Sequence, residues 1–206
     1  MFKIHRCEQR SQEWDDLRAG RITASIAKKL VTPTGKASST YRGEIGRIVA
    51  EAMGWQPPEF FQKSYWMERG IDLEPEARGM FQMQTGLVME EVGFLSHETW
   101  AAGASPDGIN ENLKEGLELK CPKPSTHVSW LREFDKSGEV PSEHLPQCHF
   151  SLAVTGWDKW HFMSYHEEAP DLIAVVERNE FTELMEKQLA KFTKELMQTK
   201  AILSGE

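Results

Sequence analysis

One stretch near the middle of the chain constrains the fold more than any other. It consists of Ala104-Ser105-Pro106-Asp107-Gly108 and, a short interval later, Leu117-Glu118-Leu119-Lys120. Pro-Asp-Gly is a turn signal, and the alternation over 117–120 is typical of a strand whose successive side chains point to opposite faces. A hairpin between the two segments would bring Asp107 beside Glu118 and Lys120, with both leucines on the other face.

These three side chains suit a particular chemistry. Two carboxylates and a neighbouring backbone carbonyl form the hard oxygen site that Mg²⁺ prefers, with room for substrate phosphate. The charge of Lys120 could activate the attacking water and stabilise negative charge developing on a phosphate. The pattern therefore favours phosphodiester hydrolysis. A Glu-Leu-Lys strand by itself would more simply be a solvated face, and the upstream Pro-Asp shifts the balance towards a metal site.

Other kinds of site find little support in the sequence. The three cysteines are scattered, and His144 and His149 have no paired cysteines nearby, so neither a zinc site nor an iron–sulfur cluster is indicated. No Walker loop or GxGxxG motif is present. An odd number of unpaired cysteines indicates free thiols in a reducing cytosol.

The charge of the chain is unevenly distributed. The net charge of −8 by itself argues against a nucleic-acid partner. However, residues 1–50 hold ten Lys or Arg against five Asp or Glu, a balance of +5, which leaves −13 for the rest. This asymmetry is compatible with a basic face for phosphates, and equally with an unevenly charged solvated surface.

The length of 206 residues is enough for one well-cored domain, and no repeat or linker divides it. No apolar run approaches the ~20 residues that span a bilayer, and the first residues do not resemble a signal peptide. We therefore expect a cytoplasmic protein with a single domain over 1–206. It would comprise N-terminal helices over 1–60, a core over 64–178 and a C-terminal helix over 180–203.

Periodicity and capping signals predict the secondary structure. Ser11 would cap one helix, and Thr23 or Ser25 another. Pro75 should kink a long helix or start a new one. The expected helices cover 11–20, 25–30, 40–53, 64–85, 125–134, 142–154 and 180–203, and the expected strands cover 87–95, 99–104, 117–121, 157–165 and 172–176, with loops at 31–36 and 54–62. This order predicts an α/β (α+β) domain in which helices flank one central mixed sheet.

Large aromatic side chains accompany several of these elements. Tyr65, Trp66, Trp157 and Trp160 could stack on bases, but rings at such spacings are more often buried in the core. The last helix carries an apolar stripe, and a stripe of this kind more often packs in the core or against another subunit than forms a binding groove.

The motif Pro106-Asp107…Glu118-Leu119-Lys120 resembles the catalytic signature of the PD-(D/E)xK nucleases, which share a restriction-endonuclease-like core. Other segments extend the likeness along nearly the whole chain. They resemble blocks of the lambda exonuclease family, the phage-type alkaline or YqaJ-like exonucleases: Trp14-Asp15-Asp16-Leu17-Arg18-Ala19-Gly20-Arg21-Ile22-Thr23-Ala24-Ser25, Gly70-Ile71-Asp72-Leu73-Glu74-Pro75-Glu76-Ala77-Arg78 and Leu145-Pro146-Gln147-Cys148-His149-Phe150-Ser151.

The resemblance implies a role for each residue of the metal site. Asp107 and Glu118 would ligate Mg²⁺, as two ions per site, together with the main-chain oxygen of Leu119. Glu74 would complete the site from its helix, although it could also be an ordinary solvated acid. Lys120 would orient or activate the attacking water. Whether Mn²⁺ can replace Mg²⁺ is left open by the sequence.

The family resemblance also implies a pocket for the end of a DNA strand. Arg18, Thr23 and Ser25 would bind the 5′-terminal phosphate, although Arg18 could simply lie at a helix end and Ser25 could be only a cap. Gln147 would help to position the water or the scissile phosphate, or be a surface amide. The family often has a second glutamine two residues on, where this chain has His149, whose role stays open.

The activity implied is that of a Mg²⁺-dependent 5′→3′ exonuclease on double-stranded DNA ends, releasing 5′-mononucleotides and leaving 3′ overhangs. The family further implies a homotrimeric ring around DNA and a single-strand-annealing recombinase as partner, encoded by a phage or prophage. The last helix or the strand over 157–165 could supply subunit contacts. The alternatives are an endonuclease or RecB-like nuclease on the same core, and a DNA-end-binding module without catalysis.

Overall fold

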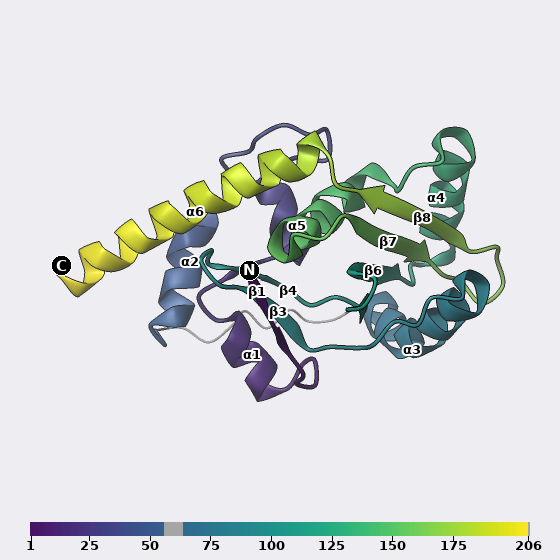
Figure 1. Cartoon of the computed structure of the whole chain (residues 1–206), viewed down its shortest axis with the longest axis horizontal. Coiled ribbons are helices and arrows are strands. Elements are labelled where there is room, and N and C mark those ends of the chain that lie inside the picture. The colour runs from purple at the N-terminus through teal and green to yellow at the C-terminus, as the bar shows by residue number, and fades with distance from the viewer. Residues whose placement is uncertain (56–63, 206) are drawn as a thin grey trace.

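Two four-stranded sheets form the framework of the protein (Figure 1). The computed structural model describes residues 1–55 and 64–205. The first sheet has the order β1-β3-β4-β2, with β1 (Phe2–His5), β3 (Phe94–His97), β4 (Ala102–Ala104) and β2 (Ile22–Thr23). The second has the order β5-β6-β7-β8, with β5 (Gly108–Asn110), β6 (Glu115–Lys120), β7 (Lys159–Ser164) and β8 (Leu172–Glu177).

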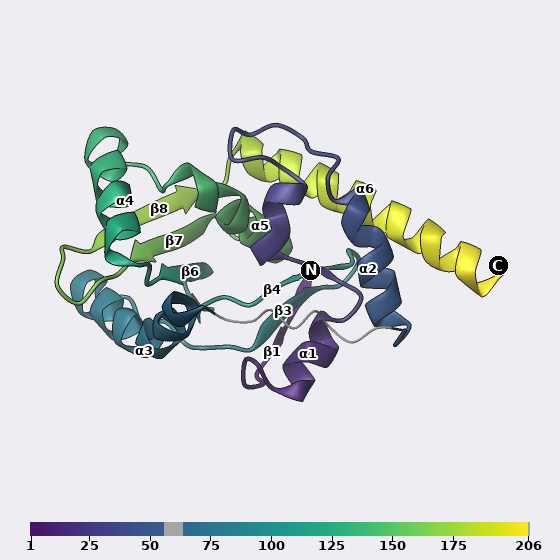
Figure 2. The same ribbon diagram turned by 180° about the vertical axis from the view of Figure 1, so that it is seen from behind.

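Helices surround both sheets. They are α1 (Gln12–Arg18), the 3₁₀ segment η1 (Ala24–Lys29), α2 (Arg42–Ala52), α3 (Tyr65–Thr85), α4 (Pro124–Ser137), the 3₁₀ segment η2 (Ser142–His144), α5 (Leu145–Thr155) and α6 (Glu180–Ser204). Seen from behind, α4 lies beside β8, and α3 lies beside β6 (Figure 2). The C-terminal end of α6 extends beyond the rest of the molecule (Figure 1).

Helix α5 is the centre of the fold. It contacts both sheets, η1 and α6, and nine of its eleven residues are buried. A helix that is apolar almost all round belongs in a core, and this sequence (LPQCHFSLAVT) carries few polar side chains. Gln147 is one of them and faces the site described below.

Strand β6 is buried on both faces. Leu117 and Leu119 pack in one apolar cluster with Ala77 and Phe81 of α3. The alternation expected from the sequence therefore holds, because Glu118 points the other way and is nevertheless only 2 % exposed. A carboxylate that is buried in this way requires partners, since an unpaired buried charge is costly.

The mixed α/β class is confirmed, but the single central sheet is wrong. The chain passes from the first sheet to the second between β4 and β5, over residues 105–107. Strands β1, β2 and β5 are absent from the sequence prediction because they have only four, two and three residues. The strand expected over 87–95 overlaps β3 only at its last two residues, and of the strand expected over 99–104 only 102–104 is formed, as β4. Glu90 contributes only an isolated bridge to Ile109.

The structure confirms only some of the helix caps and helix boundaries predicted from the sequence. Ser11 caps α1 by accepting from the N–H of Trp14, as expected. Thr23 does occupy the N-cap position of η1, but its side chain makes no capping hydrogen bond, and its hydroxyl lies 3.1 Å from that of Ser25 and bonds to it. Pro75 starts no new segment and lies inside the continuous α3. The loop expected over 54–62 falls largely outside the described residues.

The aromatic residues divide into two groups. Trp157 and Trp160 are buried, as expected, whereas Tyr65 and Trp66 at the start of α3 are 69 % and 42 % exposed. All three cysteines are free. Among the described residues no helix is both long and apolar enough to cross a membrane.

Candidate active site

Strand β6 holds Glu118 between two donors. The ammonium group of Lys120 and the side-chain amide of Gln147, which lies 2.5 Å away, both donate to Oε1 of Glu118. Lys120 lies two residues along the same strand, so the pleat places both side chains on one face. Gln147 reaches this face from α5.

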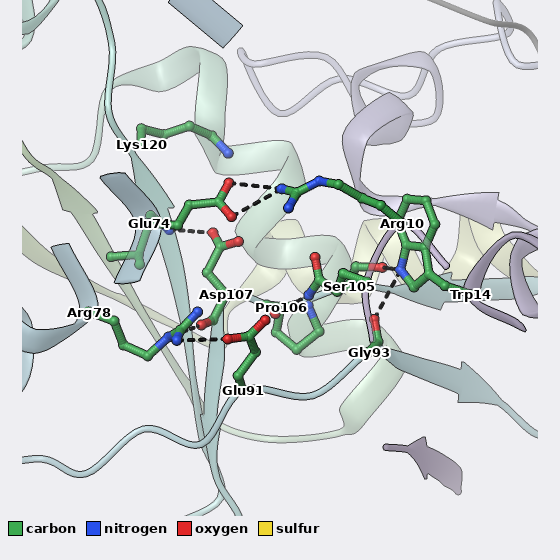
Figure 3. A network of polar contacts seen from close by, with 12 residues as sticks. Arg10, Trp14, Glu74, Arg78, Glu91, Gly93, Ser105, Pro106, Asp107 and Lys120 are labelled. Carbon is green, nitrogen blue, oxygen red and sulfur yellow. Dashed lines mark hydrogen bonds and ion pairs between the residues drawn. The ribbon is translucent and has the colours of Figure 1, made fainter. Parts of the chain in front are cut away.

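Asp107 is fixed at the junction between the two sheets. Its N–H donates to the carbonyl of Leu117 (3.1 Å), and its Oδ2 accepts from the N–H of Leu119 (2.6 Å). Arg78 of α3 donates to the main-chain oxygen of Asp107 at 2.7 Å and pairs with Glu91 at 2.9 Å (Figure 3). The hairpin expected from the sequence is thus present, and it brings Asp107 to β6.

Glu74 supplies a third carboxylate from α3. Both of its oxygens accept from Nη2 of Arg10, at 3.3 Å and 3.1 Å (Figure 3). Figure 3 shows Glu74 between Lys120 and Asp107, with the guanidinium of Arg10 approaching from the N-terminal turn. The three acids expected to form one site therefore come together from α3, the sheet junction and β6.

The three carboxylates repel one another. Burial, followed by the charge of Asp107, raises the pKa of Glu74; burial, followed by the charge of Glu118, raises that of Asp107. Burial is also the main cause of the raised pKa of Glu118, with Glu74 contributing. One buried and two half-buried acids with an excess of negative charge form the kind of environment that a cation would neutralise.

Lys120 is a permanent cation in this setting. Burial alone would lower its pKa, but the charges of Glu118 and Asp107 outweigh burial and raise it. The side chain is therefore protonated at neutral pH. As a cation it can orient a water or stabilise a negative phosphate.

The donor set fits a hard divalent cation by its chemistry. Carboxylate and carbonyl oxygens are the ligands that Mg²⁺ prefers, and the acids above have charge to be neutralised. In the described part of the chain, however, no three His, Cys, Asp or Glu side chains are arranged to hold a metal together. Glu118 is engaged by Lys120, and Glu74 by Arg10. The metal-ligand roles, that of the Leu119 oxygen included, thus stay predictions.

A pocket of about 160 Å³ adjoins this cluster. Ser25, Lys28, His144 and Gln147 line it, so one residue expected at the 5′-phosphate shares a pocket with the glutamine that bonds Glu118. Burial and the positive charges of Lys120 and Lys28 lower the pKa of His144 to about 3, so its ring is neutral. Thr23 reaches the pocket only through its bond to Ser25.

Arg18 lies apart from that pocket. Its guanidinium carbon is 3.8 Å from the centre of the Trp14 ring, and burial lowers its pKa. Within the described residues it forms no hydrogen bond or ion pair with Thr23 or Ser25. Trp14 in turn donates to Oγ of Ser105 at 2.8 Å, next to Pro106 (Figure 3). The N-terminal block is therefore tied to the Asp107 segment through Trp14.

His149 faces away from the carboxylates. Its Nδ1 lies 2.8 Å from the hydroxyl of Thr182, and its ring stacks on Phe181 with centroids 4.4 Å apart. It joins α5 to the start of α6. The open question about this position therefore has a structural answer, namely packing between two helices.

Three side chains of the site escaped the sequence analysis. Gln9 donates to the carbonyls of Val92 and Pro106, both at 3.0 Å, while Arg10 and Arg78 make the contacts given above. Arg78 belongs to the segment over 70–78 that resembles a family block, so the sequence did contain an indication of its role. Nothing in the local sequence of Gln9 or Arg10 indicates contacts this distant along the chain.

Comparisons with known proteins find solved structures that share this fold. The solved structure of LHK-Exo in complex with dAMP matches with a TM-score of 0.72 and 27% identity, covering 95% of this chain and 99% of that one. A second structure of the same protein, an alkaline exonuclease from Laribacter hongkongensis, matches with a TM-score of 0.72, 26% identity and the same coverage. A phage related exonuclease from Haemophilus somnus 129PT shares the fold, with a TM-score of 0.62 at 13% identity over 89% of this chain and 96% of that one.

No curated protein matches the chain. The model of the YqaJ-like viral recombinase domain matches residues 13–158, which include Arg18, Glu74, Asp107, Glu118, Lys120 and Gln147. Because this match covers well over half of the sequence, the chain belongs to the family of YqaJ-like viral recombinase domains.

Proposed function

We propose that this protein is a Mg²⁺-dependent 5′→3′ exonuclease that acts on double-stranded DNA ends, releasing 5′-mononucleotides and leaving 3′ single-stranded overhangs. The observation that carries the proposal is the buried carboxylate of Glu118, held by Lys120 and Gln147 beside Asp107. Burying one carboxylate beside two half-buried acids is costly unless the negative charge of these groups is needed.

Each side chain of the cluster has a role in this proposal. Asp107 and Glu118 would hold Mg²⁺ together with the Leu119 main-chain oxygen, and Glu74 would join them. The bound ions would neutralise the phosphate and stabilise the charge that develops during hydrolysis. Lys120, as a cation, would orient the attacking water, while Gln147 would keep Glu118 in place and face the phosphate.

The comparisons support an exonuclease in particular. LHK-Exo is described as an alkaline exonuclease, and it resembles this chain over almost the full length of both. That it has been solved with dAMP accords with a site that releases 5′-mononucleotides. The family description of a viral recombinase domain supports a role in recombination, in which a single-strand-annealing protein would bind the exposed 3′ strand.

The 5′ end of the DNA would be bound by the N-terminal block. Ser25 and Lys28 offer a hydroxyl and a charge in the pocket that Gln147 also lines. Arg18, stacked on Trp14, would supply a planar guanidinium for phosphate oxygens from the neighbouring helix. Thr23 would act through Ser25.

A homotrimeric ring would keep the enzyme on its substrate, in the cytoplasm of a bacterial host. Closed cyclic symmetry is a common solution for soluble oligomers. Of the two surfaces considered for subunit contacts, the strand over 157–165 is almost entirely buried, whereas α6 exposes Met197 (52 %) and Ile202 (78 %). The outer end of α6 is therefore the better surface for a subunit contact.

A comparison of linear and circular DNA tests the proposal. Linear duplex labelled at the 5′ or the 3′ end, and a closed circle, are incubated with the protein in Mg²⁺ or in EDTA. We expect early release of the 5′ label, an uncut circle and no reaction in EDTA. Nicking of the circle would instead identify an endonuclease, and binding without any release in Mg²⁺ would identify a DNA-end-binding module.

A further inference from the structure

Arg10 occupies an unusual position next to the carboxylate cluster. It lies in the turn between β1 and α1, and its φ of 69° is in the left-handed region that favours glycine. Its neighbour Gln9 bonds to the carbonyls of Val92 and Pro106, which anchors this turn to the segment before Asp107. A non-glycine residue persists in such a conformation when its surroundings hold it there, and such residues gather at functional sites.

The guanidinium of Arg10 has spare donors. Only Nη2 bonds to Glu74 among the described residues, although an arginine carries five N–H groups. The side chain of Arg10 is 40 % exposed and that of Glu74 25 %, so the pair lies at the opening of the cluster. An ion pair as exposed as Arg10–Glu74 stabilises a fold very little. Stabilisation of the fold by this pair therefore does not explain why the turn keeps its strained conformation.

We propose that Arg10 is a substrate-binding residue that rests on Glu74 in the metal-free protein and turns to a DNA phosphate when a divalent cation takes Glu74. This inference rests on the proposed function. A divalent cation attracts the Glu74 carboxylate more strongly than a guanidinium does, because it carries twice the charge. The released guanidinium then stands beside the metal site, and its planar fork matches the oxygens of a phosphodiester.

The arrangement has two consequences that can be measured separately. Without DNA, Arg10 competes with the metal for Glu74, so its removal should strengthen metal binding. With DNA, Arg10 adds a charged contact, so its removal should weaken DNA binding. A residue with a purely structural role would change neither in these directions.

The variant Arg10→Gly separates the side chain from the backbone, because glycine adopts the left-handed conformation without strain and the fold should be kept. Arg10→Lys keeps the charge and loses the planar fork. Arg6→Ala is the control, since Arg6 is similarly exposed but pairs with Glu90 and Glu111 instead. Mg²⁺ affinity is measured by calorimetry without DNA, and affinity for 5′-phosphorylated duplex is measured by fluorescence anisotropy in Ca²⁺, to separate binding from cleavage.

We expect Arg10→Gly to bind Mg²⁺ at least ~3-fold more tightly and DNA about 10- to 150-fold more weakly, the range for one charged hydrogen-bonded contact. Arg10→Lys should bind DNA with intermediate affinity, and Arg6→Ala should match the wild type in both assays. Unchanged Mg²⁺ affinity or unchanged DNA affinity in Arg10→Gly would overturn the inference while leaving the proposed function intact. A wild-type protein that neither binds Mg²⁺ nor releases nucleotides would contradict the proposed function and this inference together.

Discussion

At the scale of single residues, the position of Arg18 leads to a test of the end-binding pocket. Arg18→Ala should reduce the preference for 5′-phosphorylated over 5′-hydroxyl ends by about 10- to 150-fold, because a charged hydrogen bond is worth ~1.5–3 kcal/mol. Digestion rates on the two substrates measure the preference. Arg21→Ala is the matched control, since Arg21 donates to the Leu17 carbonyl at the end of α1. If the wild type digests both ends equally and Arg18→Ala changes nothing, the phosphate is bound elsewhere.

His149 makes the stability of the protein depend on pH. Burial lowers its pKa from 6.5 to about 4, so the folded protein keeps the ring neutral where the unfolded chain takes up a proton. The contribution of the neutral His149 ring to the free energy of unfolding is complete above pH 6.5. It is lost as the pH falls towards 4, by about 1.4 kcal/mol per pH unit.

His149→Gln removes this titration while keeping an acceptor for Thr182. Urea unfolding between pH 7 and pH 4.5 should therefore give a shallower loss of stability in the variant than in the wild type. The rest of the chain is the same in both proteins, so the difference between the two curves isolates His149. Parallel curves would show that His149 does not titrate as its burial implies.

The sequence was informative about residues whose neighbours lie close by in the chain. Glu118 and Lys120 share a face because a strand alternates, and the turn after Pro106 brings Asp107 back to them. Arg10 and Gln9 could not be found in this way, because Arg10 meets Glu74 across 64 positions of the sequence and Gln9 meets Pro106 across 97. Such contacts depend on how the elements pack, which no local pattern encodes.

At the scale of elements, the pairing of β6 with β7 depends on a glycine. Gly116 lies opposite Trp160, and a Cβ at this position would come within 2.3 Å of the indole ring, which is completely buried. Gly116→Ala should therefore cost about 1–3 kcal/mol, the usual cost of overpacking a core. Since β6 carries Glu118 and Lys120, a shift of this strand should lower activity as well.

Gly79→Ala is the control for this prediction. Gly79 lies within α3, and nothing lies within 4 Å of the added Cβ. The substitution should stabilise the helix by up to ~1 kcal/mol, since alanine is the better helix former. Urea denaturation of both variants gives the comparison, and equal effects would show that Trp160 does not limit the space above Gly116.

The long elements were the predictable ones. Helices α3, α5 and α6 and strands β7 and β8 have enough residues for their periodicity to show. The short strands β1, β2 and β5 have no such signal, and they exist because β3, β4 and β6 offer them hydrogen bonds. Hydrogen bonding between strands that lie far apart in the sequence therefore determines how the strands divide into two sheets.

At the scale of the whole molecule, charge and shape lead to a prediction about assembly. Within the part of the chain that the structure describes, five of the ten Lys and Arg side chains in residues 1–50 form ion pairs, namely Arg6, Arg10, Lys29, Arg42 and Arg47. These ion pairs reduce the positive electrostatic potential that one chain presents to DNA. Several chains around a duplex would add their positive potentials together.

Light scattering should therefore report three times the chain mass of 23.6 kDa. Replacing the exposed Ile202 of α6 by Glu should shift this mass towards that of one chain, because a charge would be buried in the contact. A wild-type monomer at micromolar concentration that still digests long duplexes processively, with excess competitor DNA present, would rule the ring out.

The claim on which the rest depends is that Glu118 holds the metal for DNA hydrolysis, and Glu118→Gln tests it most directly because it removes the charge at nearly constant volume. Nucleotide release from linear duplex in Mg²⁺ is measured for the wild type, for this variant and for Glu115→Gln, whose carboxylate lies on the same strand but pairs with His161. We predict loss of cleavage in Glu118→Gln with folding and DNA binding retained, and activity close to the wild type in Glu115→Gln. Turnover by Glu118→Gln comparable to that of the wild type would contradict the account.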